Sequence, residues 1–269
     1  MIEYEEINEL LVSSYEVPFM DGYCINLYLY GASDVKDILQ SRYYEVMPED
    51  YIVEQPSIAD LPAFCLDMDD ERAVFINADI VPKEERVNCF LENLYFAGNS
   101  IADELESEEF GARVIGDCFM EIVPLLSSGL GHSTEKSTMT GMAIDEYPIP
   151  LIGEDYRVTL NMYDNDTLMD VVVTLGDTYK DLMMKGRFQP ANNRGFVAEP
   201  SDDELAVFVN NSNADGLLMQ ETILAHELFH AARKLSGCLG GGEKLGTRIY
   251  LTLFDQFVET ISNDSITES

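Results

Sequence analysis

The sequence HELFH at positions 226–230 lies inside a predicted helix. Residues four apart project from the same face of a helix, so His226 and His230 can bind one metal ion together. Glu227, next to the first histidine, stands where it can act as a general base on a water molecule at that metal. The pattern is typical of a hydrolytic zinc site, and zinc is the cofactor that we expect.

The helix around this motif is predicted from the residues at its ends. Asp215 can cap its first turn, and Gly237 can end it after about Ser236. The chain has three histidines, and two of them fall at the metal-binding spacing around a glutamate. Composition alone rarely produces this arrangement. The competing explanation is an ordinary pair of histidines on an amphipathic helix.

The segments before the motif predict strands. Residues 156–163 alternate apolar with polar side chains, residues 170–175 are β-branched, and residues 204–210 give a third strand. A strand, a short polar loop and the motif helix follow one another in the order that a zincin requires. We therefore expect an α+β, zincin-like fold, with a small antiparallel sheet packed on the motif helix, in a catalytic region at residues 151–269.

The N-terminal region, residues 1–150, is predicted to add further helices, and either recognises a substrate or belongs to the same domain. We recognise no internal repeat in the sequence. The remaining predicted elements are a strand at 23–30, a short helix at 34–39, helices from Pro82 and at 109–126, a loop or junction at 132–150, and a last helix at 243–261.

A third metal ligand has to come from elsewhere in the chain. Arg233 and Ser236 occupy the places of the Gly and His of an HExxHxxGxxH protein, and Gly237 excludes an aspartate ligand seven residues after His230. A carboxylate from the following helix remains. The candidates, in order of preference, are Glu259, Asp255 and Glu243, and the loop histidine His132 is a further one.

Residues that stabilise the transition state are also expected after the motif. Such sites usually supply a Tyr, Arg or His that holds the oxyanion. Arg248 and Tyr250 are the candidates, although a salt-bridged arginine and a packed tyrosine would give the same sequence. The strand at 204–210 is expected to line the cleft and to pair with an extended substrate.

The motif resembles that of a known group. Residues 226–237, HELFHAARKLSG, are similar to the HELxHAxRxxxG stretch of bacterial effector zinc endopeptidases, which include type III secreted effectors and, distantly, clostridial neurotoxin light chains. The resemblance implies a protease that a specialised secretion system delivers into a host cell. The later EExxT element of that group has only partial matches, at residues 243–247 and at Glu259.

The chain is strongly acidic, because 50 Asp and Glu against 16 Lys and Arg give a formal net charge of −34. Such a surface repels nucleic-acid phosphates and anionic membranes, so we expect direct binding to neither. It attracts a basic partner, and the resemblance then implies a basic host protein as the substrate. Acidity that serves solubility alone is the plainer explanation.

The cysteines and the N-terminus predict a cytoplasmic protein. Five cysteines are scattered without a zinc-ligand spacing, and the N-terminus lacks the basic start and apolar run of a signal peptide. No apolar stretch reaches the roughly 20 residues of a membrane span. Besides the peptidase, two functions stay open: an acidic protein that mimics nucleic acid or binds a basic partner without protease activity, and a metallohydrolase acting on another bond.

Overall fold

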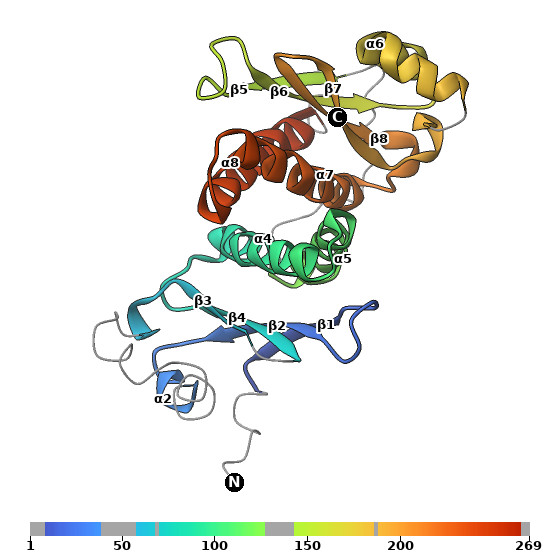
Figure 1. Cartoon of the computed structure of the whole chain (residues 1–269). Helices are drawn as coiled ribbons and strands as arrows, with labels where there is room; N and C mark the ends of the chain where they lie inside the picture. The colour runs from blue at the N-terminus through green and yellow to red at the C-terminus, as the bar shows by residue number, and fades with distance from the viewer. Residues whose placement is uncertain (1–8, 39–57, 68–69, 127–142, 186–187, 265–269) are drawn as a thin grey trace. The chain divides into compact units, whose positions relative to one another are not determined.

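The computed structural model describes residues 9–38, 58–67, 70–126, 143–185 and 188–264 (Figure 1). The chain divides into two compact units, each of which contains a four-stranded sheet. One unit comprises Met1–Ala97 and Glu121–Gly131, and the other comprises Gly98–Met120 and His132–Ser269. Helices and mixed sheets occur together, which is consistent with the α+β class.

The first sheet has the strand order β1-β2-β4-β3. Its central pair, β2 and β4, is parallel, and both outer pairs are antiparallel. The elements in this part of the chain are β1 (Leu11–Glu16), β2 (Cys24–Tyr30), α2 (Val35–Ile38), η3 (Ile58–Asp60), β3 (Ala63–Asp67), β4 (Glu71–Asn77), η4 (Lys83–Glu85), α4 (Arg86–Glu104) and α5 (Glu108–Leu126).

The second sheet has the order β5-β6-β8-β7, again with a parallel central pair and antiparallel outer pairs. The predicted antiparallel sheet is therefore wrong for the central pair. Its elements are β5 (Ala143–Pro148), β6 (Arg157–Tyr163), α6 (Leu168–Met184), η5 (Pro190–Asn192), β7 (Gly195–Ser201), β8 (Glu204–Asn210), η6 (Asn211–Asn213), α7 (Leu217–Cys238) and α8 (Glu243–Asp264).

The second sheet is covered on both faces. Every residue of β8 after Glu204 is buried. Helix α6 lies on one face, where Val171 and Leu175 pack with Phe208, and α7 and α8 lie on the other (Figure 1). A parallel pair needs a crossover connection, and a helix is its usual form. Helix α6 lies on the connection from β6 to β8, which explains why the central strands can run in the same direction.

The predicted strand at 170–175 is wrong, because these residues belong to α6. Asp164 Oδ1 accepts hydrogen bonds from the backbone N–H groups of Asp166 and Thr167, at 2.8 and 2.9 Å, just before the helix begins. Val171 is buried, whereas Val173 is 69% exposed. This one-sided burial at helical spacing outweighs the strand preference of a β-branched run.

The two sheets repeat one another in detail. Strands β4 and β8 share the sequence Glu-x-Ala-Val-Phe-x-Asn, and each ends on a fully buried asparagine. Asn77 Nδ2 donates to the Ala59 carbonyl at 3.0 Å, and Asn210 Nδ2 donates to the Asn193 carbonyl at 3.2 Å. Both asparagines thus hold the loop that leads into the neighbouring edge strand.

Aromatic packing repeats as well. The rings of Phe64 and Phe75 stack with centroids 4.8 Å apart and an angle of 10° between planes. Those of Phe196 and Phe208 stack at 4.5 Å and 14°. The two sheets therefore form an internal repeat, and the inference from the sequence that there is none is wrong. The repeat is hard to recognise in the sequence because the shared positions are few and are separated by segments of unlike sequence.

The helical hairpins α4–α5 and α7–α8 also correspond. In the first turn the Ser107 N–H donates to the Ala102 carbonyl at 2.9 Å, and in the second the Gly241 N–H donates to the Ser236 carbonyl at 2.8 Å. The residue before each donor has a positive φ, 48° and 62°. The two turns therefore define a single sequence alignment of the α4–α5 hairpin with the α7–α8 hairpin, in which Ser107 corresponds to Gly241.

In this alignment the motif helix has a counterpart without histidines. The sequence ENLYF at residues 92–96 aligns with HELFH at 226–230, so Glu92 and Phe96 occupy the positions of the two histidines. The second residue of α5, Glu109, aligns with Glu243. The histidine pair is thus present in one of the two copies.

In the described part of the chain, no helix is long and apolar enough to cross a membrane.

Candidate metal centre

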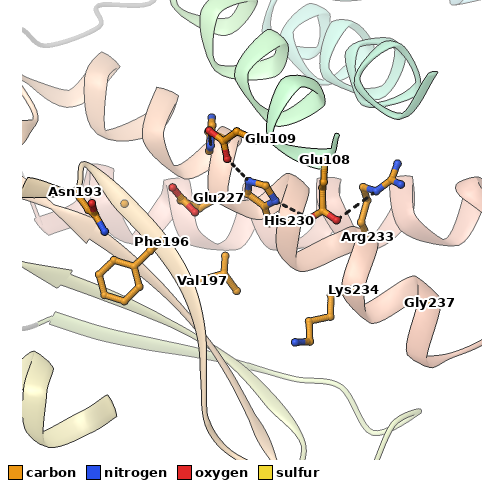
Figure 2. A pocket seen from close by; sticks show the side chains of 12 residues that line it. Glu108, Glu109, Asn193, Phe196, Val197, Glu227, His230, Arg233, Lys234 and Gly237 are labelled. Carbon is orange, nitrogen blue, oxygen red and sulfur yellow. Dashed lines mark hydrogen bonds and ion pairs between the residues drawn. The ribbon is translucent and has the colours of Figure 1, made fainter. Parts of the chain in front are cut away.

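The HELFH motif lies in the middle of α7, and both of its histidines project into one cleft. The ring centroids of His226 and His230 are 5.3 Å apart. Their side chains are 23% and 21% exposed, so a small ligand can reach them. The cleft, about 800 Å³ in volume, is lined by α7, the first turn of α5 and strand β7 (Figure 2).

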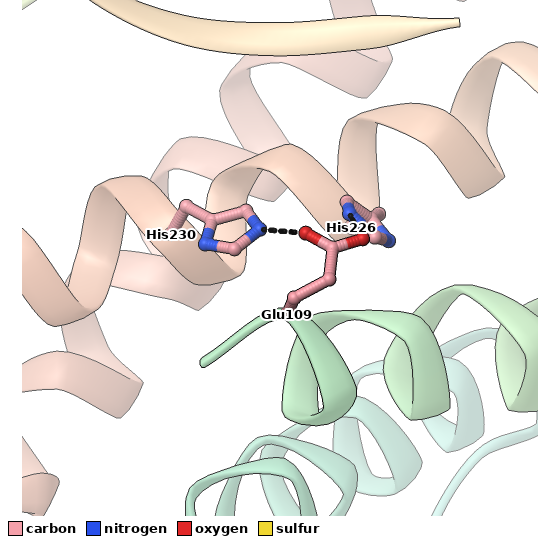
Figure 3. Close-up of side chains that lie close together, drawn as sticks. All are labelled: Glu109, His226 and His230. Carbon is pink, nitrogen blue, oxygen red and sulfur yellow. Dashed lines mark ion pairs between the residues drawn. The ribbon is translucent and has the colours of Figure 1, made fainter. Parts of the chain in front are cut away.

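A carboxylate from α5 completes a group of three possible metal ligands (Figure 3). Glu109 Oε2 lies 3.5 Å from His230 Nε2, and Glu109 Oε1 lies 3.8 Å from His226 Nε2. Ligand atoms around a tetrahedral zinc ion, with bonds of about 2.0–2.1 Å, lie about 3.3 Å apart. A small contraction of this group would surround such an ion. Two imidazoles and a carboxylate are also a ligand set that zinc accepts.

Both histidines have partners on α5 that fix their orientation. His230 Nδ1 lies 2.6 Å from Glu108 Oε1, and this contact leaves Nε2 facing Glu109. His226 is hydrogen-bonded to the backbone of Ala112. Histidines that bind metals commonly donate their second N–H to a carboxylate or a carbonyl, which fixes the tautomer and the ring plane. Helix α5 therefore supplies one possible ligand and contacts both histidines.

Small residues on α5 allow this close approach to α7. A Cβ atom on Gly116 would lie 3.5 Å from the Cβ atom of His226, in full van der Waals contact. Ala112, one turn earlier, is also small. Together with Glu109 these positions follow the three- and four-residue spacing of one helical face. A large side chain here would push α5 away and move Glu109 out of reach.

Glu227 is buried on the strand side of the cleft, with 7% of its surface exposed. It packs against Gly195 at the start of β7, where a Cβ atom would lie 2.8 Å from Glu227 Cγ. Burial raises the pKa of the Glu227 carboxyl to about 8; His230 opposes this rise, and Glu109 adds to it. A carboxyl group with a pKa near neutrality can both take and return a proton, as a general base requires.

The two histidines differ in their charge preference. Burial lowers the pKa of His226. Burial also disfavours the charged form of His230, but hydrogen bonds to Glu108 and Glu109 outweigh it and raise the His230 pKa to about 9. Hydrogen bonding to His230 is the largest cause that lowers the pKa values of both glutamates. Carboxylates that favour a proton on the ring favour a cation at the same place.

The acids expected as third ligands lie elsewhere. They are exposed residues of α8 and are not among the residues that line the cleft: Glu259, Asp255 and Glu243. Near its end α8 faces β5, since Thr260 donates a hydrogen bond to Asp145. The structure thus brings Glu109 to the histidines, and not Glu259. His132 lies outside the described residues.

The expected transition-state residues do not line the cleft either. Arg248 is exposed and lines a different pocket, of about 310 Å³. Tyr250 is fully buried and stacks on Phe254, with ring centroids 6.2 Å apart. The strand at 204–210 forms as predicted but is central in its sheet. The edge strand β7 lines the cleft in its place.

Sequence reasoning missed the contribution of α5. Glu108 and Glu109 begin a helix that the sequence predicts at nearly the observed position. Acidic residues are favoured at helix N-termini for their interaction with the helix dipole, so these two carry no mark of metal binding. The internal repeat offers one signal for Glu109. In the alignment of the two hairpins, Glu109 corresponds to Glu243, which the sequence suggests as a third ligand.

No protein-family model matches the chain, and neither a curated protein nor a solved structure matches it significantly. The resemblance of residues 226–237 to effector endopeptidases stays a prediction.

Proposed function

We propose that the chain is a zinc-dependent endopeptidase in which His226, His230 and Glu109 bind the metal and Glu227 is the general base. One observation carries the proposal: three ligand atoms from two helices lie within 4.8 Å of one another. The orienting contacts of Glu108 and Ala112 support it further, because unrelated surface histidines have no need of such partners.

The roles of the residues follow from their positions. Zinc, when bound, polarises the scissile carbonyl and a water molecule, and it favours the carboxylate form of Glu227. Glu227 takes a proton from the attacking water and passes it to the leaving amine nitrogen. Its burial against Gly195 keeps the carboxylate pointed at the cleft. Glu108 holds His230 in the tautomer that offers Nε2 as a ligand.

The form of the cleft supports cleavage within a chain. A second pocket, of about 470 Å³, shares Glu109, His226 and Glu227 with the first and extends along α7 past Thr222. A substrate could therefore continue on both sides of the reacting bond. Among the strands that the structure describes, β7 lies at the edge of its sheet, and such an edge can pair with an extended peptide.

The finer expectations belong to the same proposal. The C-terminal unit is zincin-like in its motif helix and the strand beside it, with the third ligand supplied by a helix that precedes the motif in sequence. The net charge of −34 favours encounters with a basic protein substrate. Delivery into a host cell rests on the resemblance of residues 226–237 alone.

The proposal is tested with the zinc-loaded full chain and a mixture of cellular proteins. New N-termini are identified by mass spectrometry for wild type and Glu227→Gln. We expect cleavage by the wild type, abolished by a chelator and reduced at least about 1,000-fold in the variant, which should bind zinc as before. A zinc-loaded wild type that cleaves nothing in broad mixtures, including basic proteins, would contradict the proposal.

The alternative function is an acidic binding protein without protease activity, and the net charge favours it. A binding protein would capture basic proteins equally well as wild type and as Glu227→Gln. If the biological effect of the protein survives this substitution, the peptidase proposal fails and the binding function stands.

A further inference from the structure

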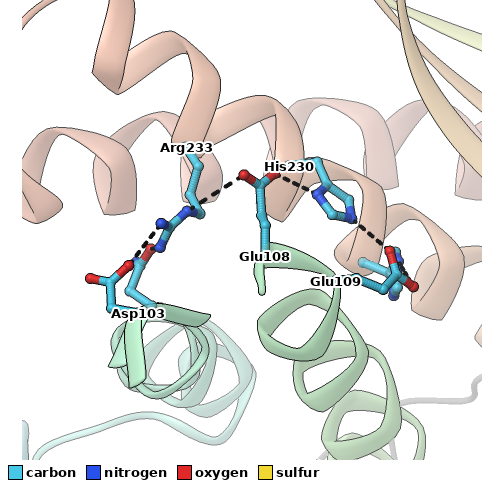
Figure 4. A network of polar contacts seen from close by, with 7 residues as sticks. Asp103, Glu108, Glu109, His230 and Arg233 are labelled. Atoms are coloured by element: carbon cyan, nitrogen blue, oxygen red, sulfur yellow. Dashed lines mark hydrogen bonds and ion pairs between the residues drawn. The ribbon is translucent and has the colours of Figure 1, made fainter. Parts of the chain in front are cut away.

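Arg233 follows His230 by one helical turn on α7 and is held by the end of α4 (Figure 4). Its Nη1 donates to Asn99 Oδ1 at 2.5 Å, and its Nη2 donates to Asp103 Oδ1 at 2.9 Å. Its guanidinium carbon also lies 5.7 Å from the ring centroid of Phe229. An arginine with two directed hydrogen bonds and an aromatic contact has a fixed position.

The remaining nitrogen of this guanidinium faces the metal centre. Arg233 Nε lies 3.8 Å from Glu108 Oε2, while the other oxygen of Glu108 contacts His230 Nδ1 at 2.6 Å. A continuous series of polar contacts therefore leads from the end of α4 through Arg233 and Glu108 to a histidine ligand.

The same arginine joins the two sides of a tight turn. Helix α4 ends at Glu104 and α5 begins at Glu108. Asp103 precedes the turn and Glu108 follows it, so Arg233 ties both to α7. The first turn of α5 also contains Glu109, so the position of Glu109 depends on the contacts of Arg233 with Asp103 and Glu108.

The positive charge of Arg233 gives these contacts a second role. Asp103, Glu108 and Glu109 bring three carboxylates close to one another at the turn, and like charges in such proximity repel. Arg233 is a cation in contact with two of them. Without it, Glu108 would turn toward solvent and the orientation of His230 would be less well defined.

We propose that Arg233 is a positioning residue of the metal centre: it holds Glu108 against His230 and fixes the first turn of α5, so that Glu109 meets the two histidines. This inference rests on the proposed function, because it presumes that the three ligands bind a metal. It concerns the geometry and affinity of the site and not a contact with substrate.

The test is metal binding by the full chain, for wild type, Arg233→Gln and Arg233→Lys. Zinc affinity is measured by competition with a chelator, and coordination geometry by the visible absorption of the cobalt(II) form. The control is Arg157→Gln. Arg157 also bridges two carboxylates, Glu146 at 3.6 Å and Glu204 at 3.4 Å, but on β6.

We expect Arg233→Gln to weaken zinc binding about tenfold or more and to lower the intensity of the cobalt absorption. Arg233→Lys should recover little, since an ammonium group cannot hold three partners as a planar fork does. Arg157→Gln should bind like wild type. In a Glu108→Gln background, Arg233→Gln should add little, because the two residues act through one contact.

Two negative outcomes are distinct. A wild type that binds no zinc overturns the proposed function. A wild type that binds zinc, together with an Arg233→Gln variant of unchanged affinity and cobalt spectrum, overturns the role of Arg233 and leaves the proposed function intact. Circular dichroism identifies a variant that fails to fold, and the cobalt spectrum of Arg233→Lys then decides.

Discussion

Glu109 Oε2 lies 3.5 Å from His230 Nε2, although α5 and α7 are separated in sequence by an entire sheet. The HELFH motif alone offers two possible ligands and a candidate base. The fold brings a third possible ligand, Glu109, from a helix that precedes the motif, and the same helix contacts both histidines. The candidate metal centre is therefore a property of the α5–α7 pair.

The third ligand is tested by comparing Glu109→Gln with Glu259→Gln. Loss of the Glu109 carboxylate should weaken zinc binding more than about 100-fold, since a ligand should matter more than its supporting partners. Glu259 is exposed on α8, and its variant should bind zinc like wild type. Chelator competition measures both. The reverse ranking would restore the ligand expected from the sequence.

Much of the local structure was predictable. The strand at 204–210 and the start of the last helix at Glu243 are found as predicted, and the predicted motif helix agrees to within a few residues. These segments have clear signals, either alternation bounded by turn residues or a cap followed by a glycine stop. The two histidines share a face because helical spacing alone determines it.

The pairing of distant segments was not predictable. A parallel or an antiparallel partner gives a buried strand the same composition, so the direction of the pairing between β6 and β8 left no mark in the sequence. The identity of Glu109 as a ligand candidate depends on how α5 packs on α7. In a chain with 50 acidic residues, no rule of spacing selects one of them.

Gly195 should be required for activity more than for metal binding. In Gly195→Ala the new methyl group would lie 2.6 Å from Ile223 Cγ2 and 2.9 Å from Glu227 Oε1, so the start of β7 must shift relative to this part of α7, which carries the proposed general base. We expect peptidase activity to fall about tenfold to 100-fold, with zinc affinity nearly unchanged. Gly153→Ala is the control, because its nearest contact would be an ordinary 3.7 Å. Equal activity of both variants would argue against a base in this position.

The buried Glu227 should make the metal-free protein less stable as pH rises. Its folded-state pKa of about 8 lies above the ordinary 4.5, so the folded state keeps a proton that the unfolded state releases. Stability is therefore lost between these two values and levels off above the higher one. Glu227→Gln cannot ionise, so its advantage over wild type should grow from pH 5 to pH 8.

The expected growth in the difference of unfolding free energy is on the order of 2–4 kcal/mol, from the size of the pKa shift. Urea denaturation in the presence of a chelator, at several pH values, measures it. A difference that is independent of pH would mean that Glu227 is well solvated in the folded protein.

The internal repeat predicts matched losses of stability. Asn77 and Asn210 are fully buried, and each bonds a loop carbonyl and accepts a backbone N–H, from Asp79 and Ser212 respectively. Replacement of either by Ala should cost about 2–3 kcal/mol, because the loop groups lose their partners. The exposed Asn192→Ala should cost less than about 0.5 kcal/mol. Thermal or urea denaturation would show whether the two buried asparagines differ.

The central claim is that His226, His230 and Glu109 form one metal site, and metal content tests it most directly. Elemental analysis is made on the full chain purified without added zinc and again after reconstitution, for wild type and His230→Ala. We predict one zinc ion per wild-type chain and almost none in the variant. Wild-type protein without zinc even after reconstitution, or a variant that keeps its zinc, would contradict the claim.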